Sequence, residues 1–242
     1  SNWKVTVVIN DDVLIAVEAG DTTASSYAVA IDLGTTTVVA TLLDLTTGTP
    51  VAVKSMLNKQ QPFGADVISR ISATMMDSKA LSLMQSAAVD TLNELIAEVC
   101  AEANVSPDSI YDIAVAGNAT MVELLLGIDP EPVGVAPFIT VARDFQQIKA
   151  SEIGLQVLAG ARCYVFPLFG AYVGGDIVAG ALATGMDRDK RVRLLIDVGT
   201  NCEIVLSDGD NILATAAPAG PAFEAASIAC GMRAADGAIE VV

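Results

Sequence analysis

The chain has no histidine, and its cysteines do not cluster. The first absence excludes Ser-His-Asp triads, histidine acid–base catalysis and histidine-ligated metal sites. The four cysteines, Cys100, Cys163, Cys202 and Cys230, form no C-x-x-C pair, so the sequence predicts neither a zinc nor an iron–sulfur site within the chain. We expect them to be buried thiols in a reducing compartment.

Positive charge and long apolar runs are scarce as well. The 13 Lys and Arg residues are outnumbered by 29 Asp and Glu residues, which gives a net charge of -16. Such a balance disfavours contact with a phosphate backbone, so we expect no nucleic acid and no membrane as a partner. Gly, Asp or Pro interrupts the apolar runs well before the roughly 18 residues that span a bilayer. Because the N-terminus also lacks the pattern of a signal peptide, we expect a cytoplasmic protein.

What the chain does contain is a large apolar fraction, 52% of its 242 residues, which is typical of a globular α/β protein. Alternating residues on both sides of a turn at 10–12 predict a β-hairpin within 1–26, as a linker from a preceding domain. Three apolar stretches within 27–57 predict successive antiparallel strands. Apolar residues at three- and four-residue spacing predict helices over 66–76 and 81–103.

Two strand-then-helix units are predicted farther along the chain. A polar residue caps the helix in each unit, Asn118 in the first and Asp176 in the second. Asn118 and the pair Gly174-Gly175 lie where strands end, a position that faces ligands in many α/β folds, although capping alone also explains Asn118. The proline-rich residues 128–150 between the units predict a long loop or a small insertion.

One short motif occurs twice, each time between two β-prone runs. The letters "IDLGT" at 31–35 return as "IDVGT" at 196–200, which predicts an internal repeat of half a domain. A strand that ends in Asp-x-Gly-Thr and reverses presents backbone N–H groups together, and this arrangement favours an anion. Glycine lets a phosphate approach closely, and the aspartate requires a hard cation such as magnesium between the two charges. The alternative, that Asp and Gly merely terminate strands, suffices for one copy but explains two copies less well.

Longer motifs extend this pattern along the chain. They are "AIDLGTTTVVATLLDLTTG", "NKQQPFGADVISRI", "GNATMVELLLGIDP", "YVGGDIVAGALATG", "LLIDVGTNCEIVL" and "AGPAFEAASIACGMRAADGAIE". The paired turns resemble those of the acetate and sugar kinase, heat-shock chaperone and actin superfamily. The motifs in this order resemble the ATPase core of the reductive activators of corrinoid proteins, over nearly all of residues 27–240.

The resemblance implies a two-lobed, ribonuclease-H-like ATPase fold of the actin and sugar-kinase type. The first lobe would occupy 27–190, and an incomplete second lobe would begin at 191–242. It also implies that Mg-ATP helps to return an inactive Co(II) corrinoid protein, the expected partner, to Co(I) in a methyl-transfer pathway. The electron would come from an iron–sulfur module of the full-length protein that is absent from this chain, and a homodimer is left open.

The same resemblance assigns roles to individual residues. Asp32 and Asp197 would hold magnesium through water, and Glu203 would orient the attacking water, with a solvent-facing strand residue as the alternative. Asp66 is a rival carboxylate, for which an acid in the first turn of a helix is the simpler interpretation. The residues expected to line the phosphates and the nucleoside are Gly34, Thr35, Thr36, Gly199, Thr200, Asn201, Gly220, Pro221 and Glu224. Cys202 stands where the family most often has glycine.

Two other functions are compatible with these residues. A small-molecule kinase of the same superfamily would transfer phosphate to an acceptor, although the sequence shows no clear acceptor-binding cluster. A nucleotide-gated interaction module would bind nucleotide without turnover. Because the second lobe stops early, we expect the chain alone to bind nucleotide weakly at most.

Overall fold

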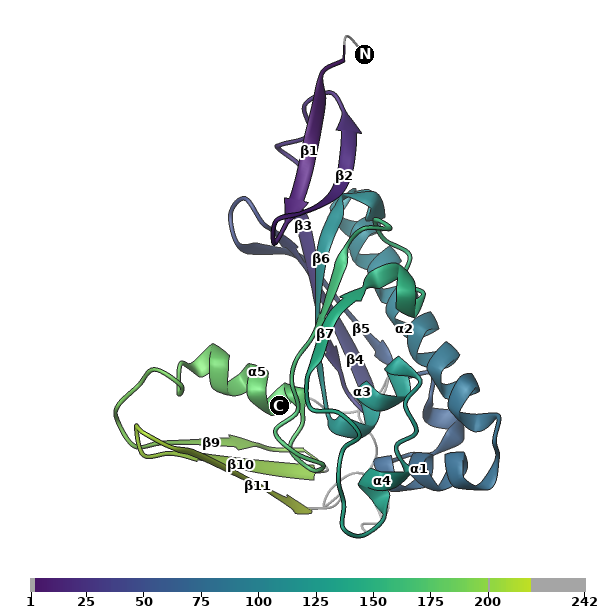
Figure 1. The fold of residues 1–242 in the computed structure, drawn as a ribbon, viewed down its shortest axis with the longest axis vertical. Coiled ribbons are helices and arrows are strands. Elements are labelled where there is room, and N and C mark those ends of the chain that lie inside the picture. Colours follow the sequence, from purple (N-terminus) through teal and green to yellow (C-terminus); the bar gives the residue numbers. More distant parts are fainter. Residues whose placement is uncertain (1–2, 200, 219–242) are drawn as a thin grey trace, which may run out of the picture. The chain divides into compact units, whose positions relative to one another are not determined.

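The computed structural model describes residues 3–199 and 201–218, and the backbone divides into two compact units. The first unit comprises Ser1–Ala179 and the second comprises Gly180–Val242. Helix α5 (Gly175–Thr184) contains the boundary between them. Figure 1 labels the helices and strands of both units.

The first unit is built on a mixed six-stranded sheet with the strand order β5-β4-β3-β6-β8-β7. Strands β3, β4 and β5 pair antiparallel, as predicted, whereas β6 runs parallel to β3 and β8 runs parallel to β6. The strands are β3 (Tyr27–Leu33), β4 (Thr37–Asp44), β5 (Thr49–Leu57), β6 (Ile110–Gly117), β7 (Phe145–Lys149) and β8 (Arg162–Val165). Alternate residues of β3, such as Val29 and Ile31, are buried, because successive side chains of a strand point to opposite faces.

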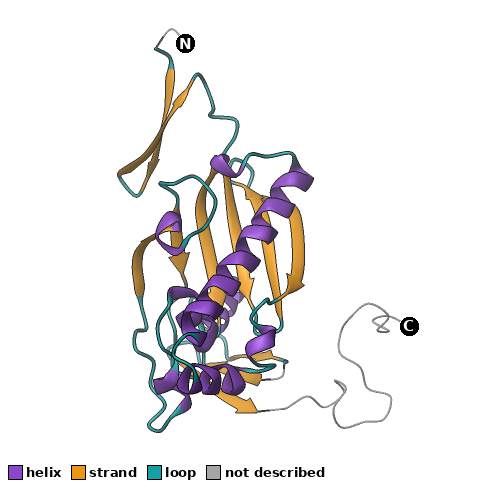
Figure 2. Ribbon diagram, turned by 90° about the vertical axis from the view of Figure 1, so that its right-hand side faces the viewer, coloured by secondary structure: helices purple, strands orange, loops and turns teal. Residues whose placement is uncertain are grey.

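Helices pack against one face of this sheet, and the long helix α2 (Ala80–Ala103) crosses the strands in Figure 2. Helix α1 (Val67–Met76) precedes it, and α3 (Ala119–Leu126) follows β6. Buried α2 residues at three- and four-residue spacing, Leu92, Leu95 and Ile96 among them, join the core on which β4 and β5 lie. The short helical elements of this unit are η1 (Gln61–Phe63), η2 (Pro107–Ser109), α4 (Glu131–Gly134) and η3 (Ala150–Ile153).

Of the two predicted caps, Asn118 and Asp176, the first is present and the second is wrong. Asp66, expected in the first turn of its helix, is instead the N-cap of α1, where its carboxylate accepts the Ser69 N–H at 2.8 Å. Asn118 caps α3 in the same way. Asp176 does not cap α5, because that helix already begins at Gly175, so the aspartate lies within the first turn.

Residues 128–150 contain more regular structure than the predicted loop. Beside α4 they include β7, which pairs antiparallel with β8 at the edge of the sheet and places Phe145 opposite Val165. The segment "FQQIK" lacks the alternating or continuous apolar pattern that predicts a strand, so only its pairing with β8 shows it.

The N-terminal hairpin forms as predicted, from β1 (Val5–Asn10) and β2 (Val13–Ala19). Asp11 and Asp12 between them both have positive φ, as a two-residue type I′ turn requires. The hairpin belongs to the first unit.

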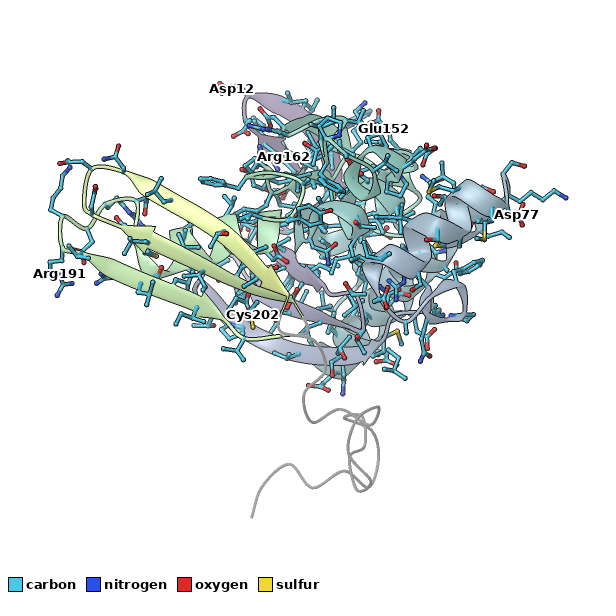
Figure 3. All side chains as sticks on the ribbon, turned by 90° about the horizontal axis from the view of Figure 1, so that it is seen from below. Asp12, Asp77, Glu152, Arg162, Arg191 and Cys202 are labelled. Carbon is cyan, nitrogen blue, oxygen red and sulfur yellow. The ribbon has the colours of Figure 1, made fainter. Side chains whose placement is uncertain are left out.

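Polar contacts attach this hairpin to the six-stranded sheet. The Tyr111 hydroxyl donates to Glu18 at 2.9 Å. Burial raises the pKa of Tyr111 to about 12, and the hydrogen bond to Glu18 acts in the same direction. Arg162 forms ion pairs with Asp11 and with Asp112, and Figure 3 shows it close to the hairpin turn that carries Asp12. The hairpin is therefore fixed to the sheet by side chains at both of its ends.

The second unit contains a three-stranded antiparallel sheet with the order β11-β10-β9. Its strands are β9 (Arg193–Asp197), β10 (Asn201–Ser207) and β11 (Ile212–Pro218). Strand, turn and two further antiparallel strands thus repeat the arrangement of β3, β4 and β5, which confirms the predicted internal repeat. Among the described residues, no helix has the length and apolar character needed to cross a membrane.

Candidate functional site

The first copy of the repeated motif forms the turn between β3 and β4, residues 34–36. A Cβ atom on Gly34 would overlap the carbonyl oxygen of Thr37, so only glycine fits here without a backbone shift. Asp32 is exposed on β3, two positions before the glycine, and its backbone pairs with Val39 of β4 and Ala116 of β6. Glycine and aspartate therefore lie together at this turn, as the sequence predicts.

Groups from outside this turn hold its backbone carbonyls. The Asn58 side chain donates to the Gly34 oxygen at 2.9 Å, and the Asn58 N–H donates to the Thr36 oxygen at 2.8 Å. Arg70 donates from Nη2 to the Thr35 oxygen at 2.6 Å. In a planar trans peptide a C=O and the following N–H point in opposite directions, so the N–H groups of Thr35 and Thr36 point away from the groups that bind these carbonyls. The turn thus presents successive backbone donors, which is the arrangement that binds anions.

Asn118 connects the turn to the start of α3. Its Nδ2 donates to the Thr35 hydroxyl oxygen at 2.9 Å, while its Oδ1 accepts the Met121 N–H at 3.0 Å. The residue therefore caps the helix and also contacts a predicted phosphate-binding residue. Because the Thr35 hydroxyl accepts this bond, its own proton is directed to a different acceptor.

The loop before α5 lies next to Asn118 as well. A Cβ on Gly174 would overlap the Cα of Asn118 and would come within 2.6 Å of the Gly117 oxygen, so this loop packs directly on the end of β6. Since β3, β6 and β8 are parallel, their carboxyl ends lie along one edge of the sheet. This edge, where α/β folds bind ligands, brings together the turn, Asn118 and Gly174.

Arg70 is a component of the site that the sequence analysis missed. Its side chain is 0% exposed, and burial lowers its pKa to about 10. Besides the Thr35 oxygen, it donates to Gln60 Oε1 at 3.0 Å and to the Gly64 oxygen at 3.1 Å. Its position on the apolar side of α1, next to the buried Ile71, was the signal in the sequence that could have revealed it.

The second copy of the motif lies in the second unit, between β9 and β10. Asp197 is exposed at the end of β9, directly opposite the half-buried Glu203 of β10 in the antiparallel register. Like charges in opposite positions disfavour strand pairing, and a divalent cation bound near them would relieve the repulsion. Cys202, at one end of the three-stranded sheet in Figure 3, donates from Sγ to the Gly199 oxygen at 3.5 Å. Its thiol therefore lies against the turn.

Several predicted residues lie outside the part of the chain that the structure describes. They are Thr200, Gly220, Pro221, Glu224 and Cys230, together with the side chain of Asn201. Within residues 3–199 and 201–218, no three His, Cys, Asp or Glu side chains form a group that could hold a metal ion directly.

The described cysteines agree with the predicted buried thiols at two positions out of three. Cys100 on α2 and Cys163 on β8 are buried, and burial raises the pKa of Cys163 to about 12. Thiols in such surroundings are poor nucleophiles. Cys202 is half-buried, so the prediction is wrong for this residue, which lies next to the turn at the start of β10.

Sequence comparisons match nearly all of this chain. Residues 27–189 match the family described as the RACo middle region, and residues 191–242 match the C-terminal domain of RACo, the ASKHA domain. Together with the repeated strand-turn-strand units, these matches define an α/β protein of the actin-like ASKHA fold.

Particular relatives narrow this class. The corrinoid activation enzyme RamQ of Eubacterium limosum is 37% identical over 236 residues, which cover 98% of this chain and 40% of RamQ. The [Co(II) methylated amine-specific corrinoid protein] reductase of Methanosarcina barkeri is 29% identical over 169 residues, or 66% of this chain and 31% of the reductase. A solved reductive activator for corrinoid,iron-sulfur protein has a TM-score of 0.88 and 38% identity, over 97% of this chain and 38% of its own. The chain belongs to the family of reductive activators of corrinoid proteins and spans 40% or less of the length of these relatives.

Proposed function

We propose that this chain is the ATP-binding and ATP-hydrolysing core of an activator that helps to return an inactive Co(II) corrinoid protein to Co(I). The observation that carries the proposal is the turn at 34–36, whose carbonyls are held by Asn58 and Arg70. The relatives support the choice of partner, because one is called a corrinoid activation enzyme and another a reductase of a Co(II) corrinoid protein.

The residues of the turn suit a nucleotide phosphate that binds with magnesium. Gly34 lets the backbone of the turn close against the Thr37 oxygen, and the N–H groups of Thr35 and Thr36 supply donors. Asp32 adds an exposed carboxylate two residues before the glycine. In the proposed complex, these N–H groups and the Thr35 hydroxyl bind phosphate oxygens, and Asp32 and Asp197 hold magnesium through water.

Hydrolysis then depends on positioning and charge, as in other phosphoryl transfers. Magnesium, when bound, would neutralise the phosphate charge. Glu203, half-buried opposite Asp197, orients the water that attacks the terminal phosphate. Gly199, Thr200 and Asn201 complete the phosphate contacts, and Gly220, Pro221 and Glu224 contact the nucleoside.

Delivery of the electron is assigned to an iron–sulfur module of the full-length protein. A cluster needs about four cysteine ligands close together. Cys100 and Cys163 are buried on different elements, and Cys202 lies in the second unit, so the described cysteines do not fit such a cluster.

The test measures ADP release by the full-length protein in Mg-ATP, alone and with a Co(II) corrinoid protein. We expect the corrinoid protein to stimulate release, and Asp32→Asn and Asp197→Asn to abolish it. Asp66→Asn is the matched control, because Asp66 is the N-cap of α1 and asparagine also caps helices. Stimulation by small alcohols or acids instead would indicate a kinase, binding without turnover would indicate an interaction module, and unchanged hydrolysis in the Asp32 and Asp197 variants would contradict the proposal.

A further inference from the structure

We propose that Arg70 is the positioning residue of the phosphate-binding turn. Its buried guanidinium fixes the Thr35 carbonyl, and through that peptide plane it aims the Thr36 N–H at the phosphate. The inference rests on the proposed nucleotide function, and it adds a residue from α1 to the site.

The contacts of Arg70 come from separate segments of the first unit. The guanidinium binds the turn at Thr35, the residue before η1 at Gln60, and the residue after η1 at Gly64. A Cβ on Gly64 would come within 2.8 Å of the Arg70 backbone nitrogen, so the chain approaches α1 closely enough to offer this carbonyl. One side chain therefore ties the turn to two neighbouring segments.

Further hydrogen bonds hold Gln60, the side chain that accepts from Arg70. Gln60 is 0% exposed, its N–H donates to Asn58 Oδ1 at 2.9 Å, and its Nε2 donates to the Met84 oxygen at 2.9 Å. Asn58 in turn binds the Gly34 and Thr36 oxygens. Asn58, Gln60 and Arg70 thus form one buried network, and its outer atoms bind the carbonyls of the turn.

The chemistry of this position favours a role beyond stability. Burying a cation is costly, and apolar residues of similar volume commonly stabilise a core as well or better. Only arginine has a planar fork of five donors that can bind three oxygens in different directions, whereas the ammonium of lysine is a compact point charge. The position therefore uses the fixed donor geometry of arginine, which orients the groups that accept its hydrogen bonds.

The test compares nucleotides that differ in their number of phosphates. Affinities for Mg-ATP, Mg-ADP and adenosine are measured by calorimetry and competition on the full-length wild type, Arg70→Lys and Gln60→Met, below the unfolding temperature of each. Tyr111→Phe is the control, because it removes a partly buried hydrogen bond to Glu18 and leaves the turn intact. We expect Arg70→Lys to weaken Mg-ATP and Mg-ADP by about tenfold, with adenosine unchanged, since small displacements of positioning groups have large effects. Gln60→Met removes one acceptor of the Arg70 guanidinium and leaves the charge of Arg70 in place. It should weaken Mg-ATP and Mg-ADP by about threefold, which is less than the effect of Arg70→Lys.

The outcomes separate this inference from the proposed function. A wild type that binds no Mg-ATP would overturn both. If the wild type binds Mg-ATP, and Gln60→Met and any folded Arg70→Lys protein bind it equally well, only the role of Arg70 is overturned. Equal weakening of Mg-ATP and adenosine would also overturn it, because a general loss of structure affects both ligands. If Arg70→Lys does not fold, Gln60→Met alone decides between these outcomes.

Discussion

Replacing Glu123 by glutamine should stabilise the protein above neutral pH and have little effect in mild acid. Glu123 lies on α3 with 0% exposure, and its Oε1 accepts the Val141 N–H at 3.2 Å. Its Oε2 is buried without a hydrogen-bond partner among the described residues. Burial raises the pKa of this carboxyl to about 7, and the nearby Asp129 charge acts in the same direction, while the Val141 N–H acts against it.

The size and sign of the effect follow from the two pKa values. An unfolded glutamate titrates near pH 4.3, roughly, so between that pH and about 7 the folded state binds more protons than the unfolded state. Stability therefore falls as the pH rises through this window. Since one pKa unit corresponds to about 1.4 kcal/mol, the ionised carboxylate lowers the free energy of unfolding by up to about 4 kcal/mol above pH 7. Glutamine keeps an oxygen for the Val141 N–H and cannot ionise, which removes this loss.

Urea unfolding of the wild type and Glu123→Gln at about pH 5 and about pH 8 measures the difference. The variant should gain most at the higher pH. Glu98→Gln is the matched control, because it makes the same substitution at an exposed position of α2. A Glu123→Gln protein with the same gain at both pH values, or with none at the higher pH, would refute the reasoning.

Two further predictions concern the turn and the start of α1. Gly34→Ala should weaken Mg-ATP by about tenfold in calorimetry, because its Cβ overlaps the Thr37 oxygen, whereas Gly170→Ala, with nothing within 4 Å of its Cβ, should bind normally. Equal binding by both variants would argue against the turn as the site. Asp66→Ala should lower the free energy of unfolding by about 1 kcal/mol through loss of its capping box, and Asp66→Asn should restore it. Altered Mg-ATP affinity in Asp66→Asn would instead favour Asp66 as a site carboxylate.

Local signals account for what the sequence predicted correctly. The repeated Asp-x-Gly-Thr predicts a strand that ends and reverses, and both β3-β4 and β9-β10 do so. Asn118 is a cap that depends on the next three residues alone. These features depend on neighbours in sequence, so residue type and spacing are sufficient to find them.

The missed features depend on distant partners. Arg70 reaches a carbonyl 35 positions earlier, and the Asn58 side chain reaches one 24 positions earlier. An arginine on the apolar side of a helix signals burial, but its acceptors are known only once the turn and α1 are packed together. Strand β7 was missed for a related reason, because its pairing with β8 and not its composition makes it a strand.

In the proposed function, the turn at 34–36 binds nucleotide phosphates through its backbone. The most direct measurement follows the backbone amide NMR signals of Thr35 and Thr36 in the 242-residue protein as Mg-ATP, Mg-ADP and adenosine are added. This readout detects weak binding as well as strong. We predict that Mg-ATP and Mg-ADP shift both signals and that adenosine does not. Unmoved Thr35 and Thr36 signals at Mg-ATP concentrations that shift signals elsewhere in the protein would contradict this role of the turn.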